Sequence, residues 1–183
     1  MAAHRRELLA SATGEILEIG FGTGLNLPCY PGHVRRLTAI DPNPEMHRKA
    51  LAMIEQTGLD VDKRVLGSEE LPFDKGSFDC VVSTFTLCSI PQVQRALAEI
   101  HRVLKPGGRF LLLEHGLSSD PKVRKWQHRL NRFQRLVGDN CHLDRNIKQL
   151  VGQQPFQTVE IEEFYLEKTP KTHGYLSKGV AMK

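Results

Sequence analysis

The sequence predicts an α/β fold, with one mostly parallel β-sheet and helices on both of its faces. Apolar, β-rich runs recur seven times, helical patterns fall between most of them, and Pro and Gly punctuate the chain as in a compact domain. Alternation of strand and helix favours parallel pairing. With 183 residues, 40% apolar and 25% charged, the chain (residues 1–183) has the size and composition of one globular domain.

The expected strands are short apolar runs bounded by turn residues. They span residues 15–19, 37–40, 61–66, 78–83, 109–114, 158–165 and 175–182. A loop over residues 167–173, without a helical pattern, separates the last two runs. We therefore expect these two strands to pair antiparallel and close the edge of the sheet.

Amphipathic patterns predict helices over residues 45–57 and 92–104. The apolar face of the first consists of Met46, Ala50, Met53 and Ile54. That of the second consists of Val93, Ala96, Leu97, Ile100 and Leu104. The Lys-Pro-Gly-Gly turn at residues 105–108 is expected to end the second helix. Residues 116–155 are expected to form an insertion before the last two strands.

A glycine loop, EIGFGTGLN at residues 18–26, directly follows the first strand. Gly20, Gly22 and Gly24 allow a tight turn and close approach of the backbone to a ligand, while the next helix offers free N–H groups. The spacing is GxGxG rather than the GxGxxG of dinucleotide-binding folds, which disfavours a nicotinamide dehydrogenase. Glu18, two residues before the first glycine, suits a nucleoside with an amino-acid tail better than a pyrophosphate.

Asp41 ends the second expected strand, seventeen residues after Gly24. A carboxylate at this point can accept hydrogen bonds from both hydroxyls of a ribose. The alternative is structural: residues 41–44 (DPNP) form a turn that caps the helix beginning near Glu45. Asp41 and the glycine loop together favour a cofactor site.

Several motifs resemble those of the class I S-adenosylmethionine-dependent methyltransferases, of the type 11-like kind. Residues 18–24 match the first motif, Asp41 the ribose-binding acid, and LGSEELPF (66–73) the adenine-side loop. Residues 78–83 match the fourth strand and LAEIHRVLKPGG (97–108) the helix and turn before the fifth. The resemblance implies a Rossmann-like, seven-stranded, mostly parallel sheet with an antiparallel last strand. It also implies S-adenosylmethionine as the cofactor, bound at the carboxyl ends of the first strands.

The resemblance implies a set of cofactor-binding residues along these motifs. They are Glu18, Gly20, Phe21, Gly22, Thr23, Gly24, Asn26, Asp41, Pro42, Asn43, Met46, Gly67, Ser68, Glu69 and Thr84. Many relatives have an acid–alanine pair where this chain has Gly67 and Ser68, so Glu69 is an alternative adenine-side contact.

A closer resemblance is to one branch of the family. It is carried by TLCSIP (86–91), LEHG (113–116), the WQ pair (126–127) and GDNCHLDR (138–145). The branch contains small bacterial methyltransferases and animal thiol S-methyltransferases, and lies near bacterial phosphatidylethanolamine N-methyltransferases. It implies a small, lipophilic acceptor, with a thiol favoured and phospholipid N-methylation as the alternative.

The segment before the first strand is short, and allows one helix over residues 4–10. Members of the branch carry further helical sequence there, which helps to cover the cofactor. Either the site is more open than usual or the chain is a short form. A cofactor-binding protein with little transferase activity is therefore an alternative from another class.

The acceptor is expected over the carboxyl ends of the fourth and fifth strands. The candidate substrate-binding residues are Phe85, Leu87, Cys88, His115, Cys141 and His142. His115 is the candidate general base or acceptor-orienting group, and the alternative is a histidine hydrogen-bonded at a strand end. Methyl transfer from a sulfonium is an in-line displacement that needs no covalent intermediate, so Cys88 is expected to be an apolar wall residue.

Other side chains in this region have structural alternatives. The rings of Phe21 and Phe85 suit a sulfonium, but also ordinary packing. The loop over residues 138–145 is either part of the acceptor site or a connector held by Asp139, Asp144 and Arg145. A metal site formed by His115, Cys141 and His142 has no support from ligand spacing, so no metal is expected.

The positive charge is concentrated in one segment, residues 122–137, which contains no acidic residue. Its cations are Lys122, Arg124, Lys125, Arg129, Arg132 and Arg135. Removing these six charges from the net +4 leaves −2 for the rest of the chain, which does not support nucleic-acid binding.

The same segment has an apolar stripe at helical spacing. Its members are Val123, Trp126, Leu130, Phe133 and Val137. The stripe fits an interfacial helix on anionic lipid, or a helix that docks on the sheet with a solvated charged face. The four cysteines form no CxxC pair, which favours free thiols and a cytoplasmic location.

Overall fold

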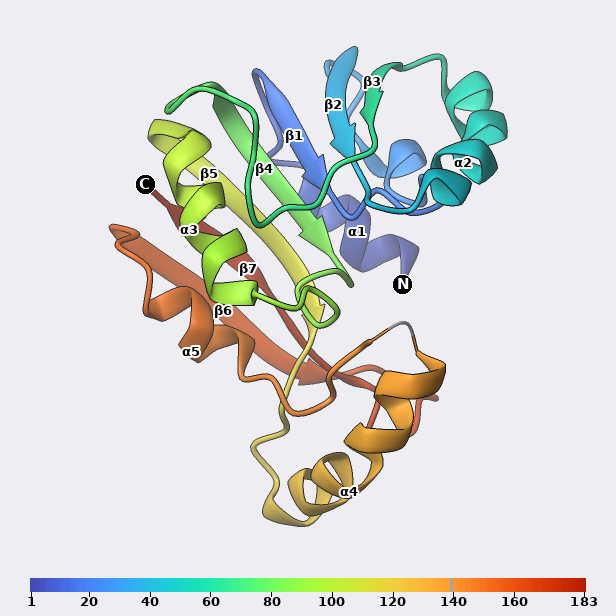
Figure 1. Cartoon of the computed structure of the whole chain (residues 1–183), viewed down its shortest axis with the longest axis vertical. Helices are drawn as coiled ribbons and strands as arrows, with labels where there is room; N and C mark the ends of the chain where they lie inside the picture. The colour runs from blue at the N-terminus through green and yellow to red at the C-terminus, as the bar shows by residue number, and fades with distance from the viewer. Residues whose placement is uncertain (139) are drawn as a thin grey trace.

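The structure is a computed structural model that describes residues 1–138 and 140–183 (Figure 1). Its elements, in chain order, are α1 (Ala2–Leu9), β1 (Ile16–Ile19), the 3₁₀ turn η1 (Leu27–Cys29), β2 (Arg36–Ile40), α2 (Pro44–Thr57), β3 (Asp60–Arg64), β4 (Phe78–Thr84), α3 (Val93–Val103), β5 (Leu104–His115), α4 (Pro121–Val137), α5 (Ile147–Gly152), β6 (Thr158–Tyr165) and β7 (Tyr175–Met182). The predicted bounds of β6 and β7 are confirmed.

Seven strands form one sheet in the order β3-β2-β1-β4-β5-β7-β6. The pairs among β1 to β5 are parallel, whereas β7 runs antiparallel to both β5 and β6. The predicted Rossmann-like sheet is therefore confirmed, including the antiparallel last strand. Because β1, β2 and β4 are neighbours and parallel, their carboxyl ends meet at one edge of the sheet, where ligands of open α/β sheets bind.

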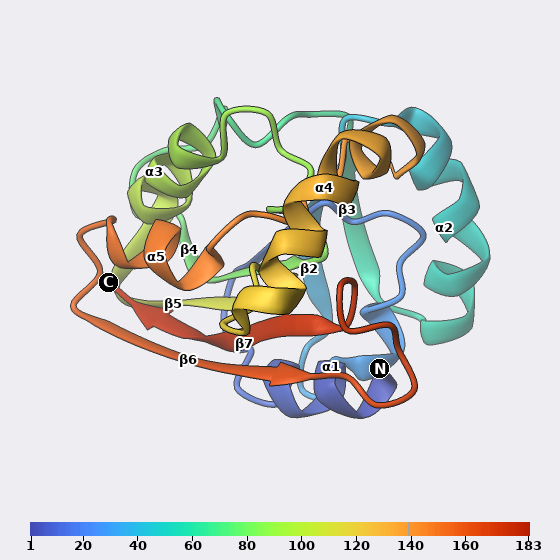
Figure 2. The same cartoon turned by 90° about the horizontal axis from the view of Figure 1, so that it is seen from below.

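Helices cover both faces of the sheet, as predicted (Figure 2). Alternate residues of β5 point to opposite faces: Phe110 and Leu112 pack with α3 and α5, while Leu111 and Leu113 belong to the core that includes α1 and α2. The sheet is thus a central layer with a packed core on each face, which explains the nearly continuous apolar runs of its inner strands.

Helix α3 ends at Val103, directly before the predicted turn, so this prediction is confirmed. The turn at residues 105–108 lies within β5, which begins at Leu104; the backbone N–H of Gly107 donates to the carbonyl of Lys183 (2.7 Å) beyond β7, so the turn stays paired.

In α2 the predicted apolar face is confirmed for Ala50, which is buried, and for Met53 and Ile54, which pack against the core. His47, which the pattern did not single out, is buried as well. His47 is drawn inward because its Nε2 lies 3.1 Å from the carbonyl oxygen of Asp41.

Residues 116–155 contain α4 and α5, between β5 and β6. In Figure 1, α4 lies beyond the carboxyl ends of β4 and β5. Its packing differs from the predicted docked stripe, because its buried side chains are Val123 and Gln127. Among the residues that the structure describes, no helix is both long and apolar enough to cross a membrane.

Candidate functional site

A cavity of about 770 Å³ opens at the carboxyl ends of β1, β2 and β4. The predicted cofactor residues that line it are Gly20, Gly22, Asp41, Pro42, Asn43, Met46, Gly67, Ser68 and Glu69. Of the predicted acceptor residues, Phe85 lines it. The fold therefore brings the glycine loop, the end of β2 and the 67–69 loop to one place.

The glycine loop adopts the backbone that its residue types predict. Gly20, Gly22 and Gly24 have φ angles of +67°, +55° and +78°, a region that side chains other than glycine rarely adopt. A Cβ on Gly20 would lie 2.0 Å from Oγ1 of Thr86. A Cβ on Gly22 would meet only the carbonyl oxygen of Gly20, at 3.9 Å, so this stretch of backbone is open to the cavity.

Asp41 lines the cavity and also holds the turn that shapes it. Its Oδ2 accepts the backbone N–H of Gly22 (2.8 Å), and its Oδ1 accepts that of Asn43 (2.9 Å). Asn43, rather than Asp41, caps α2, because its side chain accepts the N–H of Glu45. One carboxylate thus joins the glycine loop to the end of β2.

A buried polar network lies behind the glycine loop. Glu18 accepts from Nδ2 of Asn26 (3.0 Å) and from the hydroxyl of Tyr30 (2.7 Å). Asn26 also donates to Oγ1 of Thr84 (3.1 Å). Burial raises the pKa of Glu18 to about 7, against the lowering effect of its two hydrogen bonds and of Arg5. These residues support the loop from behind and are not among those that line the cavity.

Arg5 of α1 reaches this network, and sequence analysis missed it. Its guanidinium donates to Oδ1 of Asn26 and to Oγ1 of Thr84 (2.7 Å), and its Cζ lies 5.3 Å from the centre of the Phe85 ring. Burial lowers the pKa of Arg5. No sequence signal separates Arg5 from the exposed Arg6 beside it.

Phe21, Thr23 and Gly24 belong to the loop but are not among the residues that line the cavity. Phe21 is 3% exposed and lies in the core, with its ring 6.2 Å from that of His47. The structure thus places the Phe21 side chain in packing, which is the alternative that the sequence left open for it.

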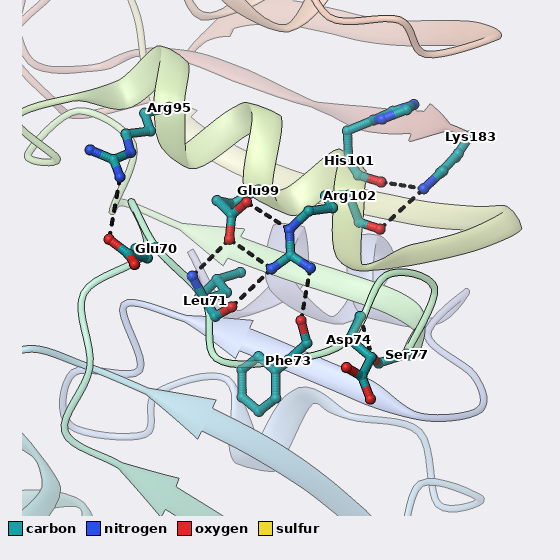
Figure 3. A network of polar contacts seen from close by, with 10 residues as sticks. All are labelled: Glu70, Leu71, Phe73, Asp74, Ser77, Arg95, Glu99, His101, Arg102 and Lys183. Atoms are coloured by element: carbon teal, nitrogen blue, oxygen red, sulfur yellow. Dashed lines mark hydrogen bonds and ion pairs between the residues drawn. The ribbon is translucent and has the colours of Figure 1, made fainter.

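The loop that carries Gly67, Ser68 and Glu69 continues into a segment bound to α3 (Figure 3). Glu99 accepts the N–H of Leu71 (2.7 Å), and Arg102 donates to the carbonyls of Leu71 and Phe73 (2.8 Å each). Arg102 also pairs with Glu99 at 2.7 Å. The Arg102 guanidinium lowers the pKa of Glu99. This network anchors the wall of the cavity through side chains that the motif alone did not single out.

The loop after β4 forms the opposite wall. Phe85 has a φ of +57°, unusual for an aromatic residue, and its N–H donates to the carbonyl of Leu113 (2.9 Å). Glu114, fully buried, accepts the N–H of Thr86 (2.9 Å) and the hydroxyl of Ser83 (2.7 Å). Burial raises the pKa of Glu114.

The remaining predicted acceptor residues are not among those that line the cavity. The ring of His115 packs edge-on against that of Phe85 at 4.8 Å, and its Nδ1 lies 3.8 Å from Sγ of Cys141. Cys88 is 2% exposed and Leu87 is fully buried. The hydrogen bond with Cys88, together with His115, lowers the pKa of Cys141 to about 5, and the same hydrogen bond and burial raise that of Cys88.

The 138–145 loop is fastened to the loop after β4. The N–H of His142 donates to the carbonyl of Cys88 (2.9 Å), and Arg145 donates to the carbonyl of Leu87. Asp144 lies 3.7 Å from Nδ1 of His142. Asp139 lies outside the described residues. The loop is thus both a connector and a wall beside the predicted acceptor side.

Comparison with known proteins agrees with this geometry. The model of a methyltransferase-domain family matches residues 17–112, more than half of the chain. The chain belongs to this family. It is an S-adenosylmethionine-dependent methyltransferase, as the sequence predicted.

Two curated relatives are each 32% identical to this methyltransferase. The human thiol S-methyltransferase TMT1A aligns over 97% of this chain and 80% of its own. A phosphatidylethanolamine N-methyltransferase from Cereibacter sphaeroides aligns over 80% of this chain and 72% of its own. The fold is also that of a solved S-adenosylmethionine-dependent methyltransferase from Thermotoga maritima, a possible histamine N-methyltransferase (TM-score 0.70, 18% identity, 100% of this chain and 89% of that one).

The cavity of the methyltransferase fits its cofactor. Its volume lies within the range of small-molecule sites. It combines exposed glycine backbone at Gly22 and a carboxylate at Asp41 with apolar surface from Ile40, Met46 and Leu66. These are the groups that a nucleoside with a charged amino-acid tail requires: acceptors for ribose hydroxyls, donors from the backbone and apolar contacts for the base.

Proposed function

We propose that this methyltransferase transfers the methyl group of S-adenosylmethionine to a small, lipophilic thiol. The observation that carries the proposal is the lining of the cavity. Among its described residues the ionisable side chains are Asp41 and Glu69, both on the predicted cofactor side. The predicted acceptor side consists of Phe85, Ile90 and Pro91 with a few neutral polar groups. A thiol suits this surface, because its thiolate is a good nucleophile, whereas an amine or phenol gains more from a positioned base.

In this proposal, Asp41 accepts the ribose hydroxyls and the open backbone of the glycine loop binds the amino-acid end. The loop over residues 67–69 contacts the adenine. The buried network of Glu18, Asn26 and Arg5 holds the glycine loop from behind rather than touching the cofactor. Catalysis then rests on alignment of the acceptor sulfur with the methyl carbon in a water-poor cavity.

His115, predicted as the catalytic residue, is not among the residues that line the cavity, and its ring packs against that of Phe85, which does line it. We assign it a positioning role: it fixes the Phe85 ring, and through that ring the acceptor. The general-base role stays a prediction. A pH profile of the same shape in the parent chain and in His115→Gln would favour positioning, while loss of the acidic limb in the variant alone would favour the base.

An acceptor competition tests the proposed function. Methyl-labelled cofactor is offered with an alkyl thiol, an alkyl amine and an alkyl phenol of matched length, and with phosphatidylethanolamine vesicles. We expect the thiol to be methylated at least about tenfold faster than the amine or phenol. Faster methylation of the amine would overturn the thiol assignment. Cofactor binding without any product would instead support a binding protein with little transferase activity.

A second candidate, phospholipid N-methylation at a membrane surface, is favoured by α4. Apart from Val123 and the half-buried Leu130, the predicted apolar stripe faces outward. Its exposed members are Trp126 (56%), Phe133 (65%) and Val137 (63%), with Leu136 (80%) beside them. The six cations lie on the same helix, and the guanidinium carbon of Arg129 lies 5.5 Å from the centre of the Trp126 ring. Anionic lipid complements both its charge and its apolar character, so we propose that α4 docks on an anionic bilayer.

Vesicle sedimentation tests the membrane contact. We expect binding to vesicles with anionic lipid, weakened by salt and reduced at least fivefold in Trp126→Gln/Phe133→Gln. Leu51→Gln, which changes an exposed leucine on α2, is the matched control and should bind as the parent chain does. Equal binding of the parent chain and the double variant would overturn the assignment. Methylation of phosphatidylethanolamine in the same vesicles would favour the second candidate function.

A further inference from the structure

Two thiols and one imidazole converge beside the cofactor cavity. Cys88 comes from the loop after β4, His115 ends β5, and Cys141 lies in the loop after α4. Their potential ligand atoms all lie within 4.8 Å of one another. His115 is 27 residues after Cys88, and Cys141 is 26 residues after His115. Three distant segments thus contribute one potential donor atom each to the same place.

The cluster is held in place by contacts other than its own. The N–H of His142 donates to the carbonyl of Cys88 (2.9 Å), and the side chain of Asn140 donates to the carbonyl of Ser89 (3.1 Å). Arg145 binds the carbonyl of Leu87. These bonds clamp the 140–145 segment to the 87–89 segment, so the two thiols are brought together by the fold before any ligand binds.

We propose that Cys88, His115 and Cys141 form a zinc site. Two sulfur donors and one imidazole suit Zn²⁺, which is borderline soft. A tetrahedral zinc ion would separate a sulfur ligand from a nitrogen ligand by roughly 3.6 Å. Sγ of Cys141 and Nδ1 of His115 are 3.8 Å apart. Sequence spacing indicated no such site, because its ligands are distant along the chain.

Three protein ligands are the number found in catalytic zinc sites, which keep a fourth position for a substrate or water. Here the site adjoins the predicted acceptor side, because the cavity is lined by neighbours of all three ligands. Phe85 packs on His115, Ser89 follows Cys88 in the chain, and Asn140 precedes Cys141. Resting on the proposed function, we assign the fourth position to the acceptor thiol. The metal site would thereby select sulfur over nitrogen or oxygen acceptors.

The reaction balances without any further reactant. The acceptor thiol loses its proton to solvent and its sulfur binds the zinc ion as a thiolate. A sulfur lone pair then forms a bond to the methyl carbon, and the bond from that carbon to the sulfonium breaks. The electron pair of the broken bond stays on the leaving sulfur, which becomes a neutral thioether, and no group changes its redox state at the metal.

Metal analysis and cobalt substitution test the site without turnover. The protein is purified with reductant from zinc-containing medium, and we expect about one zinc per chain. Exchange of Zn²⁺ for Co²⁺ should give thiolate-to-cobalt charge-transfer absorption. Cys141→Ser and Cys88→Ser should lower the zinc content at least about tenfold. Cys29→Ser, which removes another buried thiol, should keep it, as should His115→Cys, which preserves a ligand.

The outcomes separate the metal site from the proposed function. Zinc below about 0.1 per chain in the folded, reduced parent protein overturns the site, and so does a Cys88–Cys141 disulfide as its resting state. A cobalt spectrum that shifts on addition of an alkyl thiol supports the fourth-position assignment, whereas an unchanged spectrum overturns it. Thiol methylation at an unchanged rate by a metal-free protein would support the proposed function and overturn only the assignment of the acceptor thiol to the zinc ion.

Discussion

The cofactor side and the acceptor side of the cavity are built in different ways. On the cofactor side, one carboxylate, Asp41, joins the glycine loop to the end of β2 within a stretch of 24 residues from Glu18. On the acceptor side, Phe85 and the Cys88–His115–Cys141 cluster depend on the packing of β4, β5 and the 140–145 segment. The first is a local backbone structure, whereas the second is a tertiary assembly.

This difference explains why the reaction class is easier to establish than the acceptor. A glycine loop with positive φ angles admits few residue types other than glycine, so its pattern is recognisable in the sequence. The acceptor side can change whenever the segment between β5 and β6 changes, without disturbing the sheet. The thiol and phospholipid methyltransferases, both 32% identical to this chain, illustrate that acceptors differ at equal similarity.

The largest effect is expected at Gly20, and tests whether the cofactor side is as rigid as its backbone indicates. Gly20→Ala should weaken S-adenosylmethionine binding at least about 100-fold, because the new Cβ would lie 2.0 Å from Oγ1 of Thr86 at a φ of +67°. Isothermal titration calorimetry measures this loss of affinity. Gly32→Ala, with no atom within 4 Å of its Cβ, is the control and should bind normally. Near-normal binding by Gly20→Ala would show that the loop adapts.

A pH effect is expected from Glu18, behind the same loop. Its folded pKa, about 7, lies above its ordinary value of 4.5, so the fold binds this proton more tightly than the unfolded chain. Its contribution to stability is therefore complete below pH 4.5 and is lost as the pH rises through 7. Relative to the parent chain, Glu18→Gln should gain on the order of 3 kcal/mol of unfolding free energy between pH 4.5 and 8. Urea titrations that show a pH-independent difference would contradict this.

A smaller effect of opposite sign is expected at Glu99, which anchors the adenine-side wall. Its folded pKa is lowered by Arg102, so its contribution is present above pH 4.5 and is lost as the pH falls through the folded value. Glu99→Gln should cost about 1 kcal/mol at pH 7 and weaken cofactor binding several-fold. Glu70→Gln, which breaks an exposed pair with Arg95, should have little effect on either. Equal unfolding curves for the two variants would remove the anchoring role.

Sequence reasoning was most successful where function depends on local backbone. The sheet, the family and the loops that line the cavity follow from patterns of a few residues. Arg5 and the cluster of Cys88, His115 and Cys141 were not predicted as units, because their contacts join distant segments.

The docked apolar stripe expected of α4 is not observed, for a different reason. Gln127 holds the helix in place by hydrogen bonds with Ser118, Gly116 and Thr172, so a polar side chain is buried where apolar ones were expected. The cytoplasmic location and the absence of nucleic-acid binding stay predictions.

Calorimetric titration of Asp41→Asn with S-adenosylmethionine is the most direct test of the account. The cofactor side and the acceptor side of the cavity both depend on a cofactor that this carboxylate holds in position. We expect the parent chain to bind S-adenosylmethionine and not NAD, and Asp41→Asn to bind it roughly 10- to 100-fold more weakly. Asp60→Asn, which removes an exposed partner of Arg36, should bind as the parent does. Equal affinity of the parent chain and Asp41→Asn, or absence of binding by the parent chain, would contradict the assignment of this cavity to the cofactor.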